Sequence, residues 1–258
     1  MSDAVFQPDH DGWRPTELAG SPWSAEALHG GAVAALAARE AERVPSDEPM
    51  IPVRLTLELL APPPMDTIHV SADLVRPGRR VQLIEVTVTA AEAVIARGRL
   101  VRLREDHLAG LPVPEDRLPP PRDEGEPLGG WRARADGFHN LTMEHRFVRG
   151  HIRDVGPATD WMRMRHPLVP GEDPSPFQRV VAAADHGNGV SRILDFDEYV
   201  FINPDLTVYL HRLPAGEWVC LEAVTRVQPE GVGMAECAVY DEHGHIGRSV
   251  QSLLVTRA

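Results

Sequence analysis

The chain has 258 residues, of which 43% are apolar and 25% charged, so it can form one large or two small globular domains around a core. Its formal net charge of −12 excludes a general cationic field for nucleic acid or an anionic membrane, and the absence of Lys excludes Schiff-base chemistry and a phosphate-binding P-loop lysine. No apolar run approaches the roughly 18 residues that cross a bilayer, and the start lacks the features of a signal peptide. We expect a soluble, cytoplasmic protein.

The first half of the chain predicts one helix followed by an antiparallel meander. Residues 24–44 are rich in helix-forming Ala, Leu, Arg and Glu after Gly30 and Gly31, and Pro45 closes the segment. Alternating apolar and polar residues then predict strands at 55–59, 68–75, 81–90 and 94–104, with turn residues between them. A sheet covered on one face by a helix is typical of an α+β domain.

Residues 105–137 interrupt this pattern. They contain six prolines, including the run 119–121, and the pair Gly129-Gly130. Such a composition breaks helices and strands and is typical of a linker. We therefore predict an N-terminal domain at 1–104 and a C-terminal domain at 138–258.

The second half repeats the order of elements in the first. Pro176 opens a predicted helix at 175–185, and strands follow at 206–210, 218–227, 233–240 and 245–257. Leu206 stands 151 residues after Leu55, and Pro229 stands 152 residues after Pro77. This constant offset indicates an internal duplication.

Short motifs of both halves also occur in a known order and spacing: Gly12-Trp13, Pro22-Trp23, His29-Gly30-Gly31, Arg76-Pro77-Gly78-Arg79-Arg80, Trp161-x-Arg163, Ala184-Asp185, Asn203-Pro204-Asp205-Leu206-Thr207, His211-Arg212 and Ser249-Val250-Gln251. Over nearly the whole chain, this set resembles the acyl-CoA thioesterases with two fused hotdog domains, of the thioesterase II and thioesterase-like types. The resemblance implies a double hotdog, in which two sheets join edge to edge and wrap two helices. It also implies an acyl-CoA substrate, a role in fatty acid metabolism and association into homo-oligomers.

The resemblance further implies a site that holds the water attacking the thioester. Asp185 matches the acidic residue of the second helix, and Gln251 matches the glutamine of the last strand. The position of the family's hydroxyl residue has two candidates. Counting back from His211-Arg212 places Asn203 there, which has an amide but no hydroxyl, and Thr207 is the nearest hydroxyl. Asp185 as a helix cap, Gln251 as an outward-facing residue and Asn203 as a turn residue remain the structural alternatives.

The chemistry of these residues agrees with the resemblance. A carboxylate on a rigid helix, with amide neighbours, can orient water without a covalent intermediate. The N–H groups at Gly30 and Gly31 suit an oxyanion, and His29 beside them either orients substrate or bonds a loop carbonyl. Since Leu100 stands where the first half would match Gln251, we expect one composite site per chain.

The arginine run, the histidines and the cysteines do not indicate a cofactor. Arg76, Arg79 and Arg80 form the densest basic run, which fits either the phosphates of CoA or a solvated turn. The histidines lack metal-ligand spacing: His139, His145, His151 and His166. Cys220 and Cys237 lie in strand-like runs. We therefore expect neither a metal nor a cofactor.

Two other functions remain open. The adjacent pair Asp185 and His186 superficially fits a hotdog hydratase acting on enoyl-CoA, although neighbouring helix residues point in different directions. The amide of Asn203 in the hydroxyl position fits a non-catalytic acyl-CoA-binding protein. Hydrolysis of acyl-CoA thioesters is the function that Asp185 and Gln251 together favour.

Overall fold

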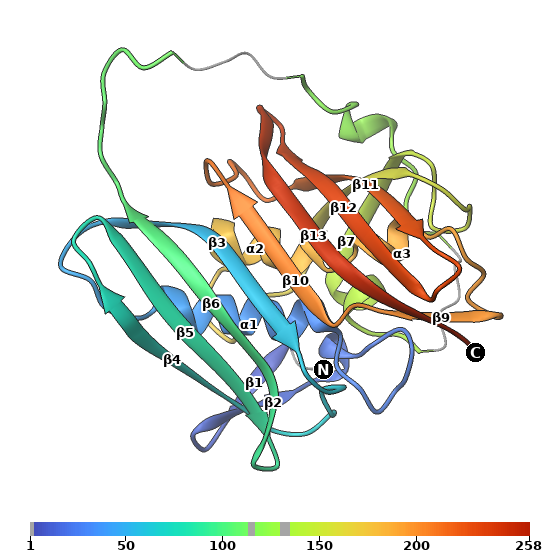
Figure 1. Cartoon of the computed structure of the whole chain (residues 1–258), viewed down its shortest axis with the longest axis horizontal. Helices are drawn as coiled ribbons and strands as arrows, with labels where there is room; N and C mark the ends of the chain where they lie inside the picture. The colour runs from blue at the N-terminus through green and yellow to red at the C-terminus, as the bar shows by residue number, and fades with distance from the viewer. Residues whose placement is uncertain (1–2, 113–116, 130–134) are drawn as a thin grey trace.

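A computed structural model describes residues 3–112, 117–129 and 135–258 (Figure 1). Within these residues, one antiparallel sheet of thirteen strands curves in front of the helices. The first half contributes β1 (Phe6–Asp9), β2 (Gly12–Pro15), β3 (Met50–Leu59), β4 (Ile68–Pro77), β5 (Val81–Ala90) and β6 (Ala93–Arg104), with helix α1 (Gly30–Glu42). The second half contributes β7 (Met143–Arg149), β8 (Ala158–Met164), β9 (Tyr199–Ile202), β10 (Asp205–Leu210), β11 (Val219–Val227), β12 (Val232–Asp241) and β13 (Gly244–Arg257), with α2 (Pro176–Ala184) and the short α3 (Gly187–Val190).

The first helix begins six residues later than predicted. His29 is its N-cap, because its backbone is extended and its Nδ1 accepts a hydrogen bond from the Gly31 N–H. A cap ends the helical hydrogen-bond ladder at that point, so residues 24–29 form a turn and two isolated β-bridges instead. The prediction of a helix from Ser24 is therefore wrong, whereas the predicted end near Val44 agrees with the structure.

The two halves join at the centre of the sheet. Strand β3 pairs with β10, where Thr56 lies opposite Thr207, and β10 pairs on its other side with β13. Behind this junction α1 packs against α2. The many alanines of α1 are buried, because small side chains allow the sheet and the second helix to approach closely.

Gly247 shows how tightly β13 and β10 approach each other. A Cβ at this position would lie 1.9 Å from the backbone oxygen of Tyr209, a distance that no side chain can occupy. We predict that Gly247→Ala separates the two strands and lowers the free energy of unfolding by about 2–4 kcal/mol. Urea unfolding measures this loss. Gly189→Ala is the matched control, since a Cβ there meets nothing within 4 Å and should cost less than about 1 kcal/mol.

The proline-rich segment crosses from the first half to the second and packs against the sheet there (Figure 1). The backbone oxygen of Pro120 accepts a hydrogen bond from the Trp161 indole at 2.9 Å, and the Arg122 guanidinium lies 4.7 Å from the centre of the Trp218 ring. Trp161 and Trp218 form a cluster separate from the main core, on the sheet face that points away from α2. Of the predicted linker 105–137, residues 113–116 and 130–134 lie outside the described residues.

Candidate active site

Asp185 lies where the two halves of the molecule meet. It is the C-cap of α2, whose other end is fixed by a capping box between Ser175 and Gln178. The N-terminus of α1 approaches from the first half, and an ideal Cβ on Gly30 would lie only 2.8 Å from the Asp185 Oδ2. Asp185 is 6% exposed, so its carboxylate is held between a helix C-terminus and the electropositive start of another helix.

Two amides bind the same oxygen of Asp185. The Nδ2 group of Asn203 donates to Oδ1 at 2.8 Å, and the Nε2 group of Gln251 donates to it at 3.1 Å. Gln251 belongs to the inward-facing row of β13 and is 1% exposed, so its interpretation as an outward-facing residue is wrong. Asn203 lies in the short connection between β9 and β10, which brings its amide to the carboxylate of Asp185.

His29 contacts the second oxygen of Asp185. Its Nδ1 lies 3.0 Å from Oδ2 and also 3.0 Å from the Gly31 N. Without a proton, Nδ1 accepts from the Gly31 N–H; with one, it donates to the carboxylate. The Nδ1 atom of His29 thus contacts both the backbone at the start of α1 and the carboxylate at the end of α2.

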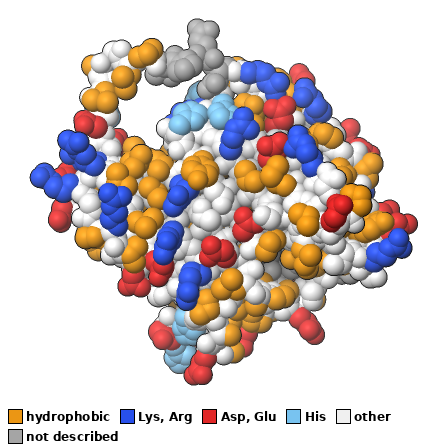
Figure 2. Space-filling model, in the orientation of Figure 1, with side chains coloured by type: hydrophobic (Ala, Val, Ile, Leu, Met, Phe, Trp, Pro, Cys, Tyr) orange, Lys and Arg blue, Asp and Glu red, His pale blue; other side chains and the backbone are white. Residues whose placement is uncertain are grey.

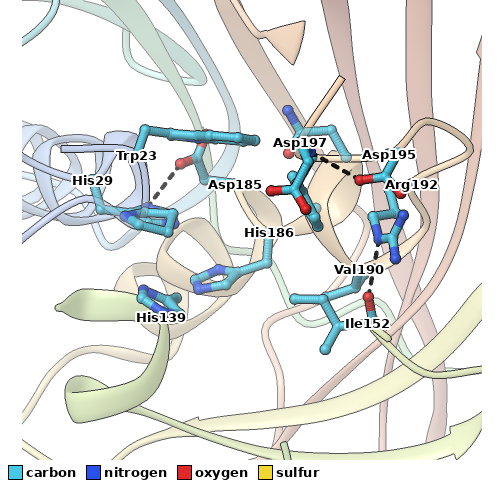
Figure 3. A pocket seen from close by; sticks show the side chains of 14 residues that line it. Trp23, His29, His139, Ile152, Asp185, His186, Val190, Arg192, Asp195 and Asp197 are labelled. Carbon is cyan, nitrogen blue, oxygen red and sulfur yellow. Dashed lines mark hydrogen bonds and ion pairs between the residues drawn. The ribbon is translucent and has the colours of Figure 1, made fainter. Parts of the chain in front are cut away.

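A cavity of about 320 Å³ opens beside Asp185 (Figure 3). His29, His139 and His186 lie on one side of it, and Arg192, Asp195 and Asp197 lie on the other. Trp23 lies across the top of the view, and Ile152 and Val190 lie below. A concave site with mixed apolar and polar walls next to a buried carboxylate is the usual form of a small-molecule site.

His139 and His186 are neutral near pH 7. Burial lowers the pKa of His139 to about 3 and lowers that of His186 well below its usual value. The His186 Nδ1 faces the carbonyl oxygens of Ala182 and Ala183, each at 3.2 Å, so this nitrogen carries the proton. His186 therefore does not pair with Asp185, contrary to what a hydratase built on these two neighbours requires.

A second acid–histidine pair lies deeper in the second half. His145 Nδ1 is 2.6 Å from Asp160 Oδ2, and both side chains are buried. Burial raises the pKa of Asp160, although contact with His145 acts in the opposite direction. The His145 Nε2 lies 2.7 Å from the backbone oxygen of His139, so the pair braces one histidine of the cavity wall.

Gly30 allows the close approach of α1 to Asp185. An alanine methyl would contact all three outer atoms of the carboxylate, at 2.8–3.2 Å. We predict that Gly30→Ala displaces the Asp185 side chain and lowers activity at least tenfold, while the melting temperature changes little, because alanine favours a helix. Thiol release and thermal unfolding of the same sample test both parts; an unchanged activity would contradict the assigned position.

Thr207 does not join this site. Its neighbours Leu206 and Val208 are buried against the helices, so the Thr207 side chain points to the opposite face of the sheet. There its Oγ1 bonds Thr56 Oγ1 at 3.3 Å, among the charged side chains of the outer face seen in Figure 2. The strand alternation thus excludes Thr207 from the group around Asp185.

The arginine run at the β4–β5 turn also lies away from Asp185. Arg79 lies 3.6 Å from Glu48, and Gln82 bonds Ser46, so the turn sits at the C-terminal end of α1. The thirteen residues of α1 separate that end from Gly30 by about 20 Å. Arg76, Arg79 and Arg80 are exposed, as expected for a solvated turn.

The described residues contain neither a candidate metal site nor a helix that could cross a membrane. In the ranges 3–112, 117–129 and 135–258, no three His, Cys, Asp or Glu side chains are grouped so that they could hold a metal ion. Across the same ranges, no helix has both the length and the apolar character to cross a membrane.

Several cavity residues were not predicted. Asn188 follows Asp185 by three residues, a helical spacing that places both on one side of the helix and could have identified it. Arg192, Asp195, Phe196 and Asp197 belong to the connection between α3 and β9, which has no periodic pattern. Only the fold brings this connection to the cavity.

Comparisons with known proteins agree with this architecture. A family model described as the acyl-CoA thioesterase N-terminal domain matches residues 19–103, and one described as the C-terminal domain matches residues 114–255. A search of curated proteins gave no match.

Solved structures show the same fold. An acyl-CoA thioesterase II from Mycobacterium marinum is 14% identical, with a TM-score of 0.68 over 98% of this chain and 94% of that one. A conserved protein of unknown function with a hot dog fold, from Alicyclobacillus acidocaldarius, is 18% identical, with a TM-score of 0.73 over 98% of this chain and 97% of that one. These similarities confirm the predicted double hotdog fold. Because the two family models together match most of the sequence, the chain belongs to the acyl-CoA thioesterase family.

Proposed function

We propose that the chain hydrolyses acyl-CoA thioesters to a free acid and CoA with a water molecule held by Asp185. The observation that carries this proposal is the binding of Asp185 Oδ1 by both Asn203 and Gln251. Two amide donors fix the carboxylate in one orientation, and its Oδ2 then faces the start of α1. Family membership supports the same reaction class.

The proposed reaction needs no covalent intermediate. The water oxygen attacks the thioester carbonyl carbon while its proton passes to Asp185 Oδ2, beside His29 Nδ1. The tetrahedral intermediate then expels the CoA thiolate, which recovers that proton. Since the amides of Asn203 and Gln251 remain on Oδ1, the carboxylate stays oriented through both steps.

The oxyanion is assigned to the start of α1. The Gly31 N–H already donates to His29, which makes Gly30 the better oxyanion donor of the two glycines. As the first residue of the helix, Gly30 has no acceptor for its N–H within α1. The helix dipole adds positive potential at this point. His29 is assigned a positioning role, because it caps the helix and contacts Asp185 at once.

One such site is proposed per chain. In the first half, Leu100 occupies the place that corresponds to Gln251 and is fully buried in the core. The first half therefore supplies His29 and Gly30, while the second half supplies Asp185, Asn203 and Gln251. The duplication has produced a complementary pair of halves instead of two equal sites.

A second candidate function is hydration of an enoyl thioester. The 3.0 Å contact between Asp185 Oδ2 and His29 Nδ1 favours it, because an acid and a histidine can together deliver water to a double bond. This pair differs from the neighbours Asp185 and His186 that the sequence suggests. Hydration leaves the thioester intact, so its products distinguish it from hydrolysis.

The test is an activity screen over saturated and 2-enoyl CoA esters of increasing chain length. Free thiol is measured with a thiol reagent, and the acid is measured by mass spectrometry. Our proposal predicts equal amounts of CoA and free acid. Water added without thiol release would instead identify a hydratase, and binding without any turnover would identify an acyl-CoA-binding protein.

A further inference from the structure

Asn188 is a buried polar side chain that the proposed reaction does not use. It is 8% exposed and lines the cavity beside Asp185. Its backbone N–H donates to Gln251 Oε1 at 3.3 Å, but its carboxamide has no hydrogen-bond partner among the residues that the structure describes. Its amide atoms are not among the fully buried, unpartnered polar atoms of the described residues, so they reach the open cavity and are available to hydrogen-bond a ligand there.

The position of Asn188 relative to Asp185 indicates which part of a substrate its carboxamide would contact. Asp185 and His186 both have right-handed helical backbone angles, so the turn from Asp185 into α3 remains helical. Residues three apart in a helix lie on the same side, with Cβ atoms about 5–6 Å apart. If Asp185 directs water to the thioester carbon, the Asn188 carboxamide faces the next carbons of the acyl chain.

The charges around the cavity select a neutral substituent on those carbons. Asp195 and Asp197 are exposed on the side opposite the histidines, and Asp185 adds a third carboxylate (Figure 3). Arg192 is the cation of the cavity wall, and its guanidinium donates to three backbone oxygens and lies over the Phe196 ring. Three carboxylates against one occupied guanidinium disfavour an acyl group that ends in a carboxylate.

We propose that this site takes short acyl thioesters with a neutral oxygen, a hydroxyl or a keto group, on the second or third carbon, and that Asn188 recognises this oxygen. The inference rests on the proposed hydrolysis, whose substrate class it narrows. The cavity of about 320 Å³ lies at the lower end of the usual range for ligand sites, which fits a short chain. Asn188 is a specificity residue here, because its amide Nδ2–H donates to the substrate oxygen.

The test compares CoA esters of equal length. Butanoyl-CoA, 2-hydroxybutanoyl-CoA, 3-hydroxybutanoyl-CoA, 3-oxobutanoyl-CoA and succinyl-CoA are assayed with the wild type and with Asn188→Leu, which keeps the size of the side chain but removes its polarity. We expect at least one of the three neutral oxygenated esters to exceed butanoyl-CoA tenfold or more in kcat/KM, a factor worth about 1.4 kcal/mol. Succinyl-CoA should be a poorer substrate than both butanoyl-CoA and the preferred oxygenated ester.

In Asn188→Leu, the advantage of the oxygenated ester should disappear while butanoyl-CoA is hydrolysed at least as fast as before. Butanoyl-CoA is thus the internal control for folding and for the catalytic group. Asp195→Asn should raise kcat/KM for succinyl-CoA alone. Equal kcat/KM for all neutral esters in the wild type, or a preference that survives in Asn188→Leu, would overturn the proposal.

A binding experiment separates this inference from the proposed hydrolysis. The thioethers S-butyl-CoA, S-(2-hydroxybutyl)-CoA and S-(3-hydroxybutyl)-CoA lack the carbonyl and cannot be hydrolysed, so calorimetry measures their affinities whether or not the chain is an enzyme. Tighter binding of a hydroxylated thioether, lost in Asn188→Leu, would support recognition by Asn188 even if no ester is hydrolysed. Equal binding of all three would contradict it.

Discussion

Asp185→Asn is expected to lower kcat for thioester hydrolysis by about 10²–10⁴, the usual contribution of a general base. The substitution keeps the shape of the side chain but removes the charge that orients water and accepts its proton. Asn203 and Gln251, which both donate to Oδ1, are uncharged amides, so neither can accept the water proton in place of Asp185. Thiol release at saturating acyl-CoA measures the loss, and thermal unfolding shows that the variant is folded.

Thr207→Val gives the matched contrast. Thr207 is a candidate from the family resemblance because it is the nearest hydroxyl. In the structure its side chain lies on the outer face of the sheet, where it forms a hydrogen bond with Thr56. We expect its kcat to stay within about twofold of wild type, since surface substitutions away from the site change little. A large loss in Thr207→Val, or full activity in Asp185→Asn, would contradict the proposed site.

The second large effect concerns stability in acid. Burial holds the pKa of His139 at about 3 and that of His186 well below 6.5, whereas both titrate near 6.5 in the unfolded chain. Below pH 6.5 the unfolded state therefore binds more protons than the native state. The stability contributed by these neutral histidines is complete above pH 6.5 and is lost as the pH falls below it, at up to about 1.4 kcal/mol per pH unit for each group that stays neutral in the native state.

Urea unfolding between pH 4 and pH 7 measures this effect by comparison with a variant. His186→Phe keeps an aromatic ring in the stack with His29 and removes one titrating group. Below pH 6.5 its free energy of unfolding should fall less steeply with acid than that of the wild type, by up to about 1.4 kcal/mol per pH unit. Replacing the exposed His107 by Asn should leave the slope unchanged. Identical slopes for wild type and His186→Phe would refute the prediction.

Periodicity was sufficient to predict the central elements of the fold. The long strands β4, β5, β11, β12 and β13 lie close to their predicted ranges, because their burial follows the alternation of apolar and polar residues. Helix α2 lies close to its predicted range because Pro176 marks its start. The missed strands β1, β2 and β9 are only four residues long, and β7 and β8 carry several buried polar residues, among them His145 and Asp160. A rule based on apolar alternation cannot recognise such strands.

The site could be predicted only where a resemblance identified its residues. Asp185, Asn203 and Gln251 are far apart in the sequence, and only the tertiary fold brings them together. The contact of His29 with Asp185 joins opposite halves of the chain, so no local pattern contains it. Strand alternation, in contrast, was available for Thr207, since it lies between the apolar residues Leu206 and Val208.

The central claim is direct attack by a water molecule that Asp185 orients. It is tested most directly by a single turnover of acyl-CoA in ¹⁸O-labelled water, followed by mass spectrometry of the acid product and of the peptide that contains Asp185. Our account predicts one ¹⁸O atom in the released acid, an equal amount of free CoA and an unlabelled Asp185. An ¹⁸O atom in the carboxylate of Asp185, or no released acid at all, would contradict it.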